Sequence, residues 1–178
     1  MPYDEGIFIK KEVVETPIDN VFKNSSFTSS FYELYRNSCG VDFKIICKGK
    51  TFNVHKIVLI AHSPVLRTML VEHKETKECI ENTLNIDWVE IPTLQLMINF
   101  MYTGTIPDTL SGDEFVDLLQ LADRYNITLL HTLCQDRLIK LHLLELNVYE
   151  LLKVSDTFTA QFLMDACIKM VILIFLFY

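Results

Sequence analysis

The stretch DFKIICKGKTFNVHKIVLIAHSPVL, residues 42–66, decides the fold, because its periodicity changes from that of a strand to that of a helix. Its first part alternates, with Phe43, Ile45 and Cys47 on one face and charged side chains on the other, which is typical of a half-buried strand. A short glycine-containing turn then returns the chain as residues 51–54. This order predicts a β-hairpin.

The same stretch then becomes helical. Residues 55–61 predict a short helix, and Ser63-Pro64 predicts the start of another, since a serine oxygen caps free amides while proline fills the first helical position. His55, alone between a strand and a helix, is expected to be a satisfied core residue rather than an acid or base. The charged residues 72–81 indicate a surface helix end and a loop, and residues 83–87 are strand-like again.

The second half of the chain is predicted to be mostly helical. Pro92 opens a helix that ends at Thr103-Gly104, where glycine adopts the left-handed conformation, and Ser111-Gly112-Asp113-Glu114 is a capping box for the next helix. A further helix is expected over residues 128–141, and Asn147 is predicted to cap another. The side chains expected to face inward on these later helices are Phe115, Leu118, Leu119, Ala122, Leu130, Leu133, Cys134, Leu138, Leu141, Val148, Leu151 and Leu152.

The part of the chain before the hairpin divides into an extension and a helix. Residues 1–27 mix charge, proline and polar residues, which indicates an N-terminal extension. A helix is expected over residues 29–38, where Phe31, Leu34 and Tyr35 fall on one stripe. This apolar stripe needs a partner, either within the chain or in a second copy.

Composition, charge and cysteine usage narrow the class of protein. The 178 residues are 50% hydrophobic and 22% charged, with 5 Gly and 5 Pro, as in a packed and mostly helical single domain. The net charge of −7 and the pI near 5.2 provide no positive field for phosphate backbones, so nucleic-acid binding is not expected. The 5 cysteines are irregularly spaced and no secretory leader precedes them, which predicts reduced, buried thiols in the cytoplasm or nucleus.

The last helix, expected from about Thr159, ends in an unbroken apolar run from Met170 to Tyr178. A helix that spans a bilayer needs about 20 apolar residues, and Asp165 and Lys169 interrupt this one. Membrane association is therefore not expected. We expect the apolar face of this helix to pack on residues outside this sequence.

No constellation of residues predicts an enzyme. His131 and Cys134 stand three residues apart on an expected helix, as two metal ligands can, but no third or fourth ligand has a matching spacing. The sequence contains neither a glycine-rich phosphate loop nor a nucleophile-elbow motif. We therefore expect no catalysis, no metal and no cofactor.

Several motifs together resemble the BTB/POZ domain family. In the family's order and spacing, they are Asp42-Phe43-Lys44-Ile45, Phe52-Asn53-Val54-His55-Lys56, Ser63-Pro64-Val65-Leu66, Phe100-Met101-Tyr102-Thr103-Gly104 and Leu121-Ala122-Asp123-Arg124-Tyr125. The resemblance covers about residues 29–141, and residues 148–170 are similar to the helical extension of cullin-3 adaptors of the speckle-type POZ class. It implies an α+β BTB/POZ fold in which helices cap a small sheet and a 3-box/BACK-like helical extension follows.

The resemblance divides the chain into an N-terminal extension, a BTB/POZ domain and a helical extension with an apolar tail. Their expected ranges are 1–27, 28–141 and 142–178. It also implies a protein-interaction module that forms a homodimer and has no catalytic activity.

Two sets of residues acquire roles from this resemblance. In the family the first helix packs against its two-fold mate, which assigns Phe31, Leu34 and Tyr35 to the dimer interface. Asp42 and Lys56 match the family's charged pair at the floor of the groove beside that interface. An isolated buried charge costs several kcal/mol, so we expect the two side chains to be paired, either as a fold stabiliser or as a ligand-binding element.

Cullin-3 adaptors of this family carry a hydrophobic-x-Glu element after the helix that here begins at Ser63. The triplet Leu70-Val71-Glu72 fits the letters but lies too early, and Thr76-Lys77-Glu78 keeps the glutamate without the apolar anchor. Because such an anchor dominates an interface, its absence is expected to cost about 2 kcal/mol. Tyr125 and the helix after Asn147 are the other expected cullin contacts, although each is equally consistent with plain surface or core.

Two functions therefore stay open. The first is a homodimeric adaptor that brings a substrate protein to a cullin-3 ubiquitin ligase for ubiquitination. The sequence contains no MATH, kelch or zinc-finger segment, so this unknown substrate would dock on residues 1–27, on the BTB groove or on a region outside this sequence. The second is a dimerisation or scaffold module in transcriptional or signalling regulation without cullin. The missing anchor favours the second function and the extension helices favour the first.

Overall fold

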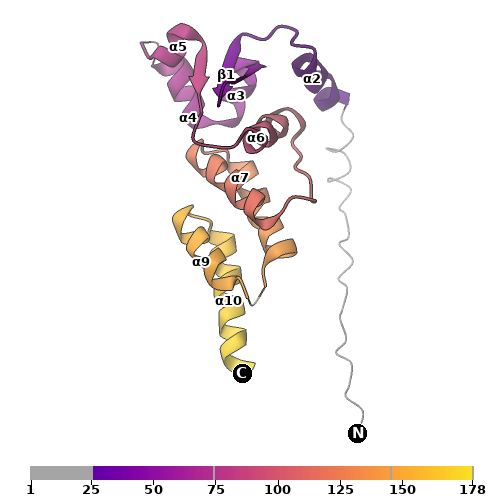
Figure 1. Ribbon diagram of the computed structural model, residues 1–178, viewed down its shortest axis with the longest axis vertical. Helices are drawn as coiled ribbons and strands as arrows, with labels where there is room; N and C mark the ends of the chain where they lie inside the picture. Colours follow the sequence, from indigo (N-terminus) through magenta and orange to yellow (C-terminus); the bar gives the residue numbers. More distant parts are fainter. Residues whose placement is uncertain (1–25, 74, 145, 178) are drawn as a thin grey trace.

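The computed structural model describes residues 26–73, 75–144 and 146–177 (Figure 1). The described chain begins with helix α2 (Ser26–Arg36) and ends with helix α10 (Gln161–Phe177). A small sheet and its helices form one end of the molecule, and α10 forms the other end (Figure 1). Of the expected N-terminal extension, residues 1–25 lie outside the described residues.

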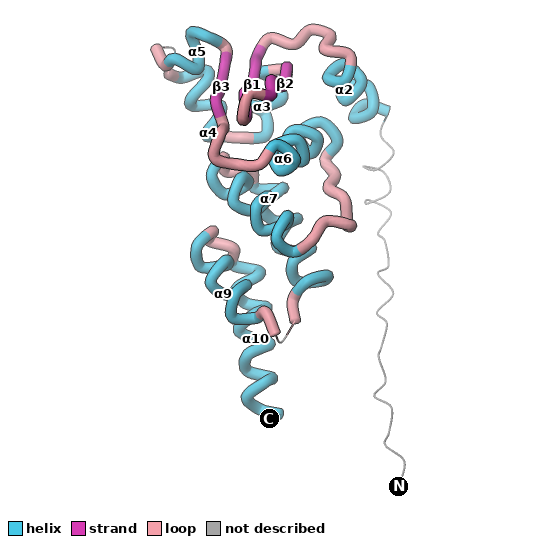
Figure 2. The backbone as a smooth tube through the Cα atoms, in the orientation of Figure 1, coloured by secondary structure: helices cyan, strands magenta, loops and turns pink. Residues whose placement is uncertain are grey.

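The sheet is built on the predicted hairpin. Its strands are β1 (Phe43–Cys47), β2 (Lys50–Val54) and β3 (Thr83–Asn85). Figure 2 shows β1 in the middle, where it pairs antiparallel with β2 and parallel with β3. The alternation of β1 is confirmed, because its side chains at positions 43, 45 and 47 are buried while Lys44 is exposed. A mixed α+β fold results.

A parallel pair of strands needs a crossover connection, and here short helices provide it. They are α3 (Lys56–His62), α4 (Pro64–Arg67), the π-helical turn η1 (Thr68–Glu72) and α5 (Lys77–Glu81). The predicted cap at Ser63 is confirmed, since its Oγ accepts a hydrogen bond from the backbone N of Leu66 at 3.0 Å. The same hydroxyl donates to the backbone O of Tyr125 and thereby ties the crossover to the end of a later helix.

The central helices follow their sequence signals. They are α6 (Ile91–Thr103), α7 (Gly112–Arg124), α8 (Thr128–Arg137) and the π-helical turn η2 (Leu138–His142). Gly104 ends α6 with φ +70°, a conformation that disfavours any side chain. In the capping box, the backbone N of Ser111 donates to Glu114 Oε2 at 2.8 Å, and the backbone N of Glu114 donates to Ser111 Oγ at 3.3 Å.

The prediction that Leu141 faces inward is wrong, because 49% of its surface is exposed. The chain passes from α-helical to π-helical geometry at Leu138, and a π turn rotates the following side chains away from the α-helical stripe. The inward predictions on α7 are confirmed, since its apolar stripe is fully buried. Cys47, Cys134 and Cys167 are buried free thiols, whereas Cys39 is exposed, contrary to the expectation for all five cysteines.

The helical extension is a hairpin of α9 (Val148–Thr157) and α10 that packs against α8. Gln135 of α8 is buried, and its Oε1 accepts hydrogen bonds from the backbone N of Phe162 at 2.9 Å and of Leu163 at 3.2 Å. These amides lie in the first turn of α10, where no carbonyl of the same helix can reach them. A side chain from another helix therefore caps α10.

Asn147 does not cap α9 with its side chain, so this prediction is wrong. Its Oδ1 accepts from the backbone N of Leu144 at 2.8 Å, and its Nδ2 donates to the backbone O of His142 at 2.7 Å. An amide side chain can bond to backbone groups on either side of it, and here the loop before α9 offers both partners. Asn147 therefore closes that loop.

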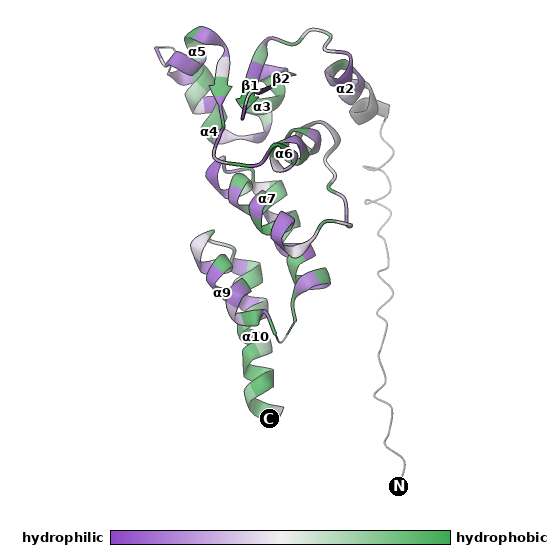
Figure 3. Ribbon diagram, viewed as in Figure 1, coloured by the Kyte–Doolittle hydropathy of each residue, from purple (hydrophilic) through white to green (hydrophobic). Residues whose placement is uncertain are grey.

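The apolar tail of α10 is divided by its surroundings. Met170, Val171 and Ile174 pack partly on the core, whereas Ile172 and Phe175 are exposed, 51% and 76% respectively. Figure 3 shows the end of this helix as uniformly hydrophobic where it extends past α9. Within the described ranges, no helix combines the length and the apolar content that a membrane crossing requires.

His62 is a titratable group packed inside the fold. Its ring lies edge-on to Phe100, with centroids 6.2 Å apart. Burial lowers the pKa of His62 from its ordinary value of 6.5, and a hydrogen bond with the Met101 backbone partly offsets this by raising it. The native state therefore favours the neutral imidazole.

We predict that replacing Gln135 with Leu lowers the free energy of unfolding by about 2 kcal/mol, because two amides of α10 lose their acceptor in a buried place. Urea denaturation measures this change. The control is Gln120→Leu, since Gln120 is exposed on α7. Equal stability of the two variants would contradict the capping role.

We predict that the stability of the protein falls as the pH drops below 6.5, in part through His62. In that range the unfolded histidine binds a proton that the native one resists, so the unfolded state binds more protons and is favoured. Above that range both states are neutral and the contribution disappears. Thermal melts between pH 5 and pH 7 should show a flatter dependence for His62→Gln than for the exposed control His73→Gln. Parallel curves for the two variants would rule out this role.

Candidate protein-interaction surfaces

Helix α2 is attached to the rest of the protein through Tyr35. The Tyr35 ring stacks on the Tyr102 ring with centroids 4.7 Å apart, and Gln95 Nε2 donates to the Tyr35 hydroxyl at 3.0 Å. Phe31 and Tyr35 pack against the core of their own chain, whereas Leu34 is 40% exposed. Of the three residues of the expected dimer interface, only Leu34 is exposed, and the other two are partly buried within their own chain.

A hydrogen-bonded hub lies beneath α2. The buried Tyr102 hydroxyl accepts from the backbone N of His55 at 2.9 Å and lies 2.8 Å from His55 Nδ1. His55 Nε2 lies 2.8 Å from the carbonyl O of Cys39, which can only accept, so Nε2 carries a proton. Burial raises the pKa of Tyr102 to about 12, which keeps the phenol protonated. The prediction that His55 is a satisfied structural residue is confirmed.

Asp42 and Lys56 are neighbours, but not as an ion pair. Asp42 Oδ1 accepts from the backbone N of Lys56 at 2.7 Å, and Lys56 Nζ donates to Asn82 Oδ1 at 3.0 Å. Among the described residues, no ion pair joins the two side chains. The expectation of a buried pair is corrected, because Asp42 is exposed to water and its carboxylate satisfies a free amide at the start of α3.

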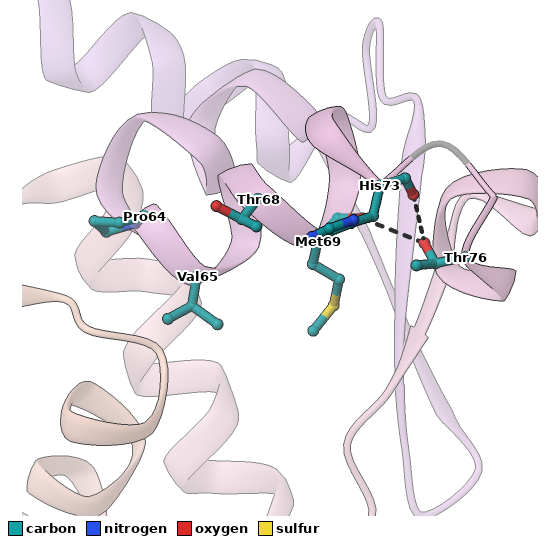
Figure 4. A pocket seen from close by; sticks show the side chains of 6 residues that line it. All are labelled: Pro64, Val65, Thr68, Met69, His73 and Thr76. Carbon is teal, nitrogen blue, oxygen red and sulfur yellow. Dashed lines mark hydrogen bonds between the residues drawn. The ribbon is translucent and has the colours of Figure 1, made fainter.

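An open apolar groove runs along α4 and η1. Its volume is about 510 Å³. The lining residues are Pro64, Val65, Thr68, Met69, His73 and Thr76. Figure 4 shows the side chains of Val65 and Met69 pointing to the same side of the helix. A groove of this size and polarity can hold an aliphatic or aromatic side chain of a partner.

Thr76 holds the far wall of this groove in place. Its Oγ1 donates to the backbone O of His73 at 3.0 Å and lies 3.3 Å from the backbone O of Met69 (Figure 4). It also accepts from the backbone N of Cys79 as the cap of α5. One hydroxyl therefore joins η1 to the start of α5.

The expected cullin contacts are scattered by the fold. Leu70 is buried and contacts the core, so the triplet it begins presents only Val71 and Glu72 at the surface. Glu78 is half-buried on α5, and Tyr125 is only 5% exposed. Of the six residues, Thr76 is the one that lines the groove.

Sequence reasoning missed Val65 and Met69. The sequence contained a signal for them. Leu66 and Leu70 are apolar and stand four residues apart, which is the spacing of an inward helical stripe, and the structure buries both. Residues one position earlier on the same helix lie beside that inward stripe and form the edge of its apolar face. Apolar residues at such positions indicate a surface that a partner can cover.

His131 and Cys134 take part in packing. His131 Nε2 lies 2.9 Å from the backbone O of Phe158, and its Nδ1 lies 3.0 Å from Gln135 Nε2. Cys134 is fully buried, and burial raises the pKa of its thiol to about 12. His131 thus helps to join the extension to α8. Within the part of the chain that the structure describes, no group of three or more His, Cys, Asp or Glu side chains has the arrangement of a metal site.

Comparison with known proteins identifies a family for this chain. The model of the BTB/POZ domain matches residues 31–142. The chain is 33% identical to TD and POZ domain-containing protein 4 of Mus musculus over 140 residues, which cover 79% of this chain and 37% of that protein. It is 29% identical to BTB and MATH domain-containing protein 40 of Caenorhabditis elegans over 145 residues, which cover 79% and 36% respectively. The chain thus spans about a third of the length of these relatives.

Proposed function

Because the chain belongs to the BTB/POZ domain family, whose fold is a protein-interaction domain, we propose that it is a homodimeric substrate adaptor of a cullin-3 ubiquitin ligase. The adaptor role needs no catalytic residue, no metal and no cofactor. Its unknown substrate protein docks away from the cullin surface. The candidate places are residues 1–27, the BTB groove beside the dimer interface and a region outside this sequence. The free thiols of all five cysteines support a reducing compartment, the cytoplasm or nucleus.

The observation that carries this proposal is the apolar groove along α4 and η1. The hydrophobic-x-Glu element lacks an exposed apolar anchor here, because Leu70 belongs to the core. The groove supplies apolar contact in the same region of the chain. In the proposal, an apolar side chain of the cullin is buried between Val65 and Met69 of this chain. The interface thus still buries an apolar anchor, but the anchor comes from the cullin instead of from this chain.

Self-association is proposed through α2. This helix lies at an edge of the described molecule and packs mainly on α6 (Figure 1). Leu34 is exposed beside the partly buried Phe31 and Tyr35, so a second α2 can extend the apolar contact across a two-fold axis. The proposed dimer presents two cullin grooves.

A scaffold without cullin is the second candidate. Burial of Leu70 favours it, because the family's expected anchor is then not available to a cullin. In that case the groove and α2 would still serve association, with transcriptional or signalling partners instead of a ligase.

We predict that Leu34→Asp raises the dimer dissociation constant by about tenfold or more, because a carboxylate is desolvated at the proposed two-fold contact. Analytical ultracentrifugation measures the mass of each sample. The control is Ile57→Asp, since Ile57 is 62% exposed on α3. A wild-type protein that sediments as a monomer, or a Leu34→Asp variant that dimerises normally, would disprove the interface.

We predict that the full chain binds a cullin-3 N-terminal domain with a dissociation constant below about 1 μM at one cullin per protomer. Val65→Glu should weaken this binding by about tenfold or more, because it places a charge in the apolar groove. Val71→Glu is the matched control, since Val71 has a similar exposure outside the groove lining. Calorimetry measures affinity and stoichiometry.

The outcomes of this titration separate the candidates. If Val71→Glu weakens cullin binding and Val65→Glu does not, the cullin contacts the triplet that begins at Leu70 instead of the groove. A folded wild-type protein that gives no heat at tens of micromolar would eliminate the adaptor and leave the scaffold.

A further inference from the structure

An exposed tryptophan and an arginine are stacked at the end of α7. Trp88 lies in the loop before α6 and is 40% exposed. The guanidinium carbon of Arg124, the last residue of α7, lies 4.8 Å from the centroid of the Trp88 ring. Tryptophan and arginine are the residue types that most often dominate binding at protein interfaces.

The guanidinium is positioned without a carboxylate. Arg124 forms no ion pair among the described residues, and it lies close enough to Tyr125 to lower the pKa of that phenol, which burial raises more strongly. The acidic residues next to the pair in sequence have other partners. Asp123 Oδ1 accepts from Thr159 Oγ1 at 3.1 Å, and Asp87 Oδ1 accepts from the backbone N of Lys48. Because a guanidinium has five N–H donors, most of its capacity to bind an anion is left.

The stacked pair lies next to the groove. Ser63 donates to the carbonyl of Tyr125, the residue after Arg124, and Pro64, the residue after Ser63, lines the groove. Figure 1 shows the end of α7 beside α4. A protein segment whose apolar side chain enters between Val65 and Met69 can therefore reach Arg124 with a neighbouring residue.

We propose that Arg124, stacked on Trp88, binds an aspartate or glutamate side chain of the protein segment that docks in the groove. This inference rests on the groove as the docking site proposed above, and it adds the chemistry of the occupant: an apolar anchor accompanied by a carboxylate. The cation–π contact keeps the guanidinium over the Trp88 ring, and the planar fork of an arginine suits a bidentate carboxylate.

The net charge of −7 does not prevent such a partner from binding. At physiological ionic strength the screening length is about 8 Å, so exposed carboxylates farther away act weakly on a docked acid. A guanidinium in direct contact is screened much less. Local complementarity therefore decides which segment the surface prefers.

The first test uses the full chain and a cullin-3 N-terminal domain in calorimetry. Arg124→Glu should weaken binding by about tenfold or more, because the pair becomes repulsive. Arg124→Lys should weaken it by about threefold, since lysine keeps the charge but loses the planar fork. Arg67→Glu is the matched control, because Arg67 is also exposed and donates its Nε to the backbone O of Ile60. Its effect should stay within about twofold.

The salt dependence of binding distinguishes direct recognition of a carboxylate by Arg124 from a merely structural role of this residue. The ratio of wild-type to Arg124→Glu affinity should shrink when the salt concentration rises from about 0.05 M to about 0.5 M. Thermal melts establish that each variant is folded. If Arg124→Glu binds like wild type, or loses no more affinity than Arg67→Glu, the inference is overturned while the adaptor function stands.

A second test does not depend on cullin. Short random peptides displayed on phage are selected on the wild-type protein and, in parallel, on Arg124→Glu. Enrichment of peptides that combine an apolar residue with Asp or Glu, lost on Arg124→Glu, supports the inference even if cullin-3 does not bind and the adaptor function fails. Selection with no acidic preference, or with the same preference on both proteins, overturns it.

Discussion

The buried hydroxyl of Ser63 is the interaction on which both ends of the proposed docking surface depend. It accepts a hydrogen bond from the first turn of α4 and donates one to the carbonyl that ends α7. A buried hydroxyl without partners is costly, and here a single oxygen satisfies an amide and a carbonyl from distant parts of the chain. The orientation of α4 on α7 follows, and with it the placement of Leu66 inward and of Val65 at the surface.

A second buried polar side chain, Gln135, joins the extension to α8 through hydrogen bonds, as Ser63 joins α4 to the end of α7. Gln135 supplies the acceptor that the first turn of α10 lacks, so the helical hairpin is held by directional bonds as well as by apolar packing. The docking surface and the extension are therefore held by two separate polar contacts. Different sets of side chains line them, so changes at the groove need not disturb α10.

Most elements were predictable from the sequence because their causes are local. Alternation in β1, the serine before Pro64, the capping box at Ser111 and the glycine after α6 each act within a few residues. Two of the predictions that failed involve a choice between competing hydrogen-bond partners. Asn147 bonds to the preceding loop instead of its own helix, and Asp42 bonds to a backbone amide instead of Lys56. In each case a backbone group that the sequence does not position was the nearer partner.

The sequence by itself determined the hairpin, the helix starts at Ser63 and Ser111 and the family, since these depend on the order and spacing of neighbouring residues. Only the tertiary structure decided which apolar side chains are available to a partner. Leu70 and Val71 are adjacent and chemically alike, yet one is buried and the other exposed. Likewise, Trp88 and Arg124 are far apart in the chain and meet only because the loop before α6 passes the end of α7. Surfaces are defined by contacts between distant segments, and no local pattern encodes those contacts.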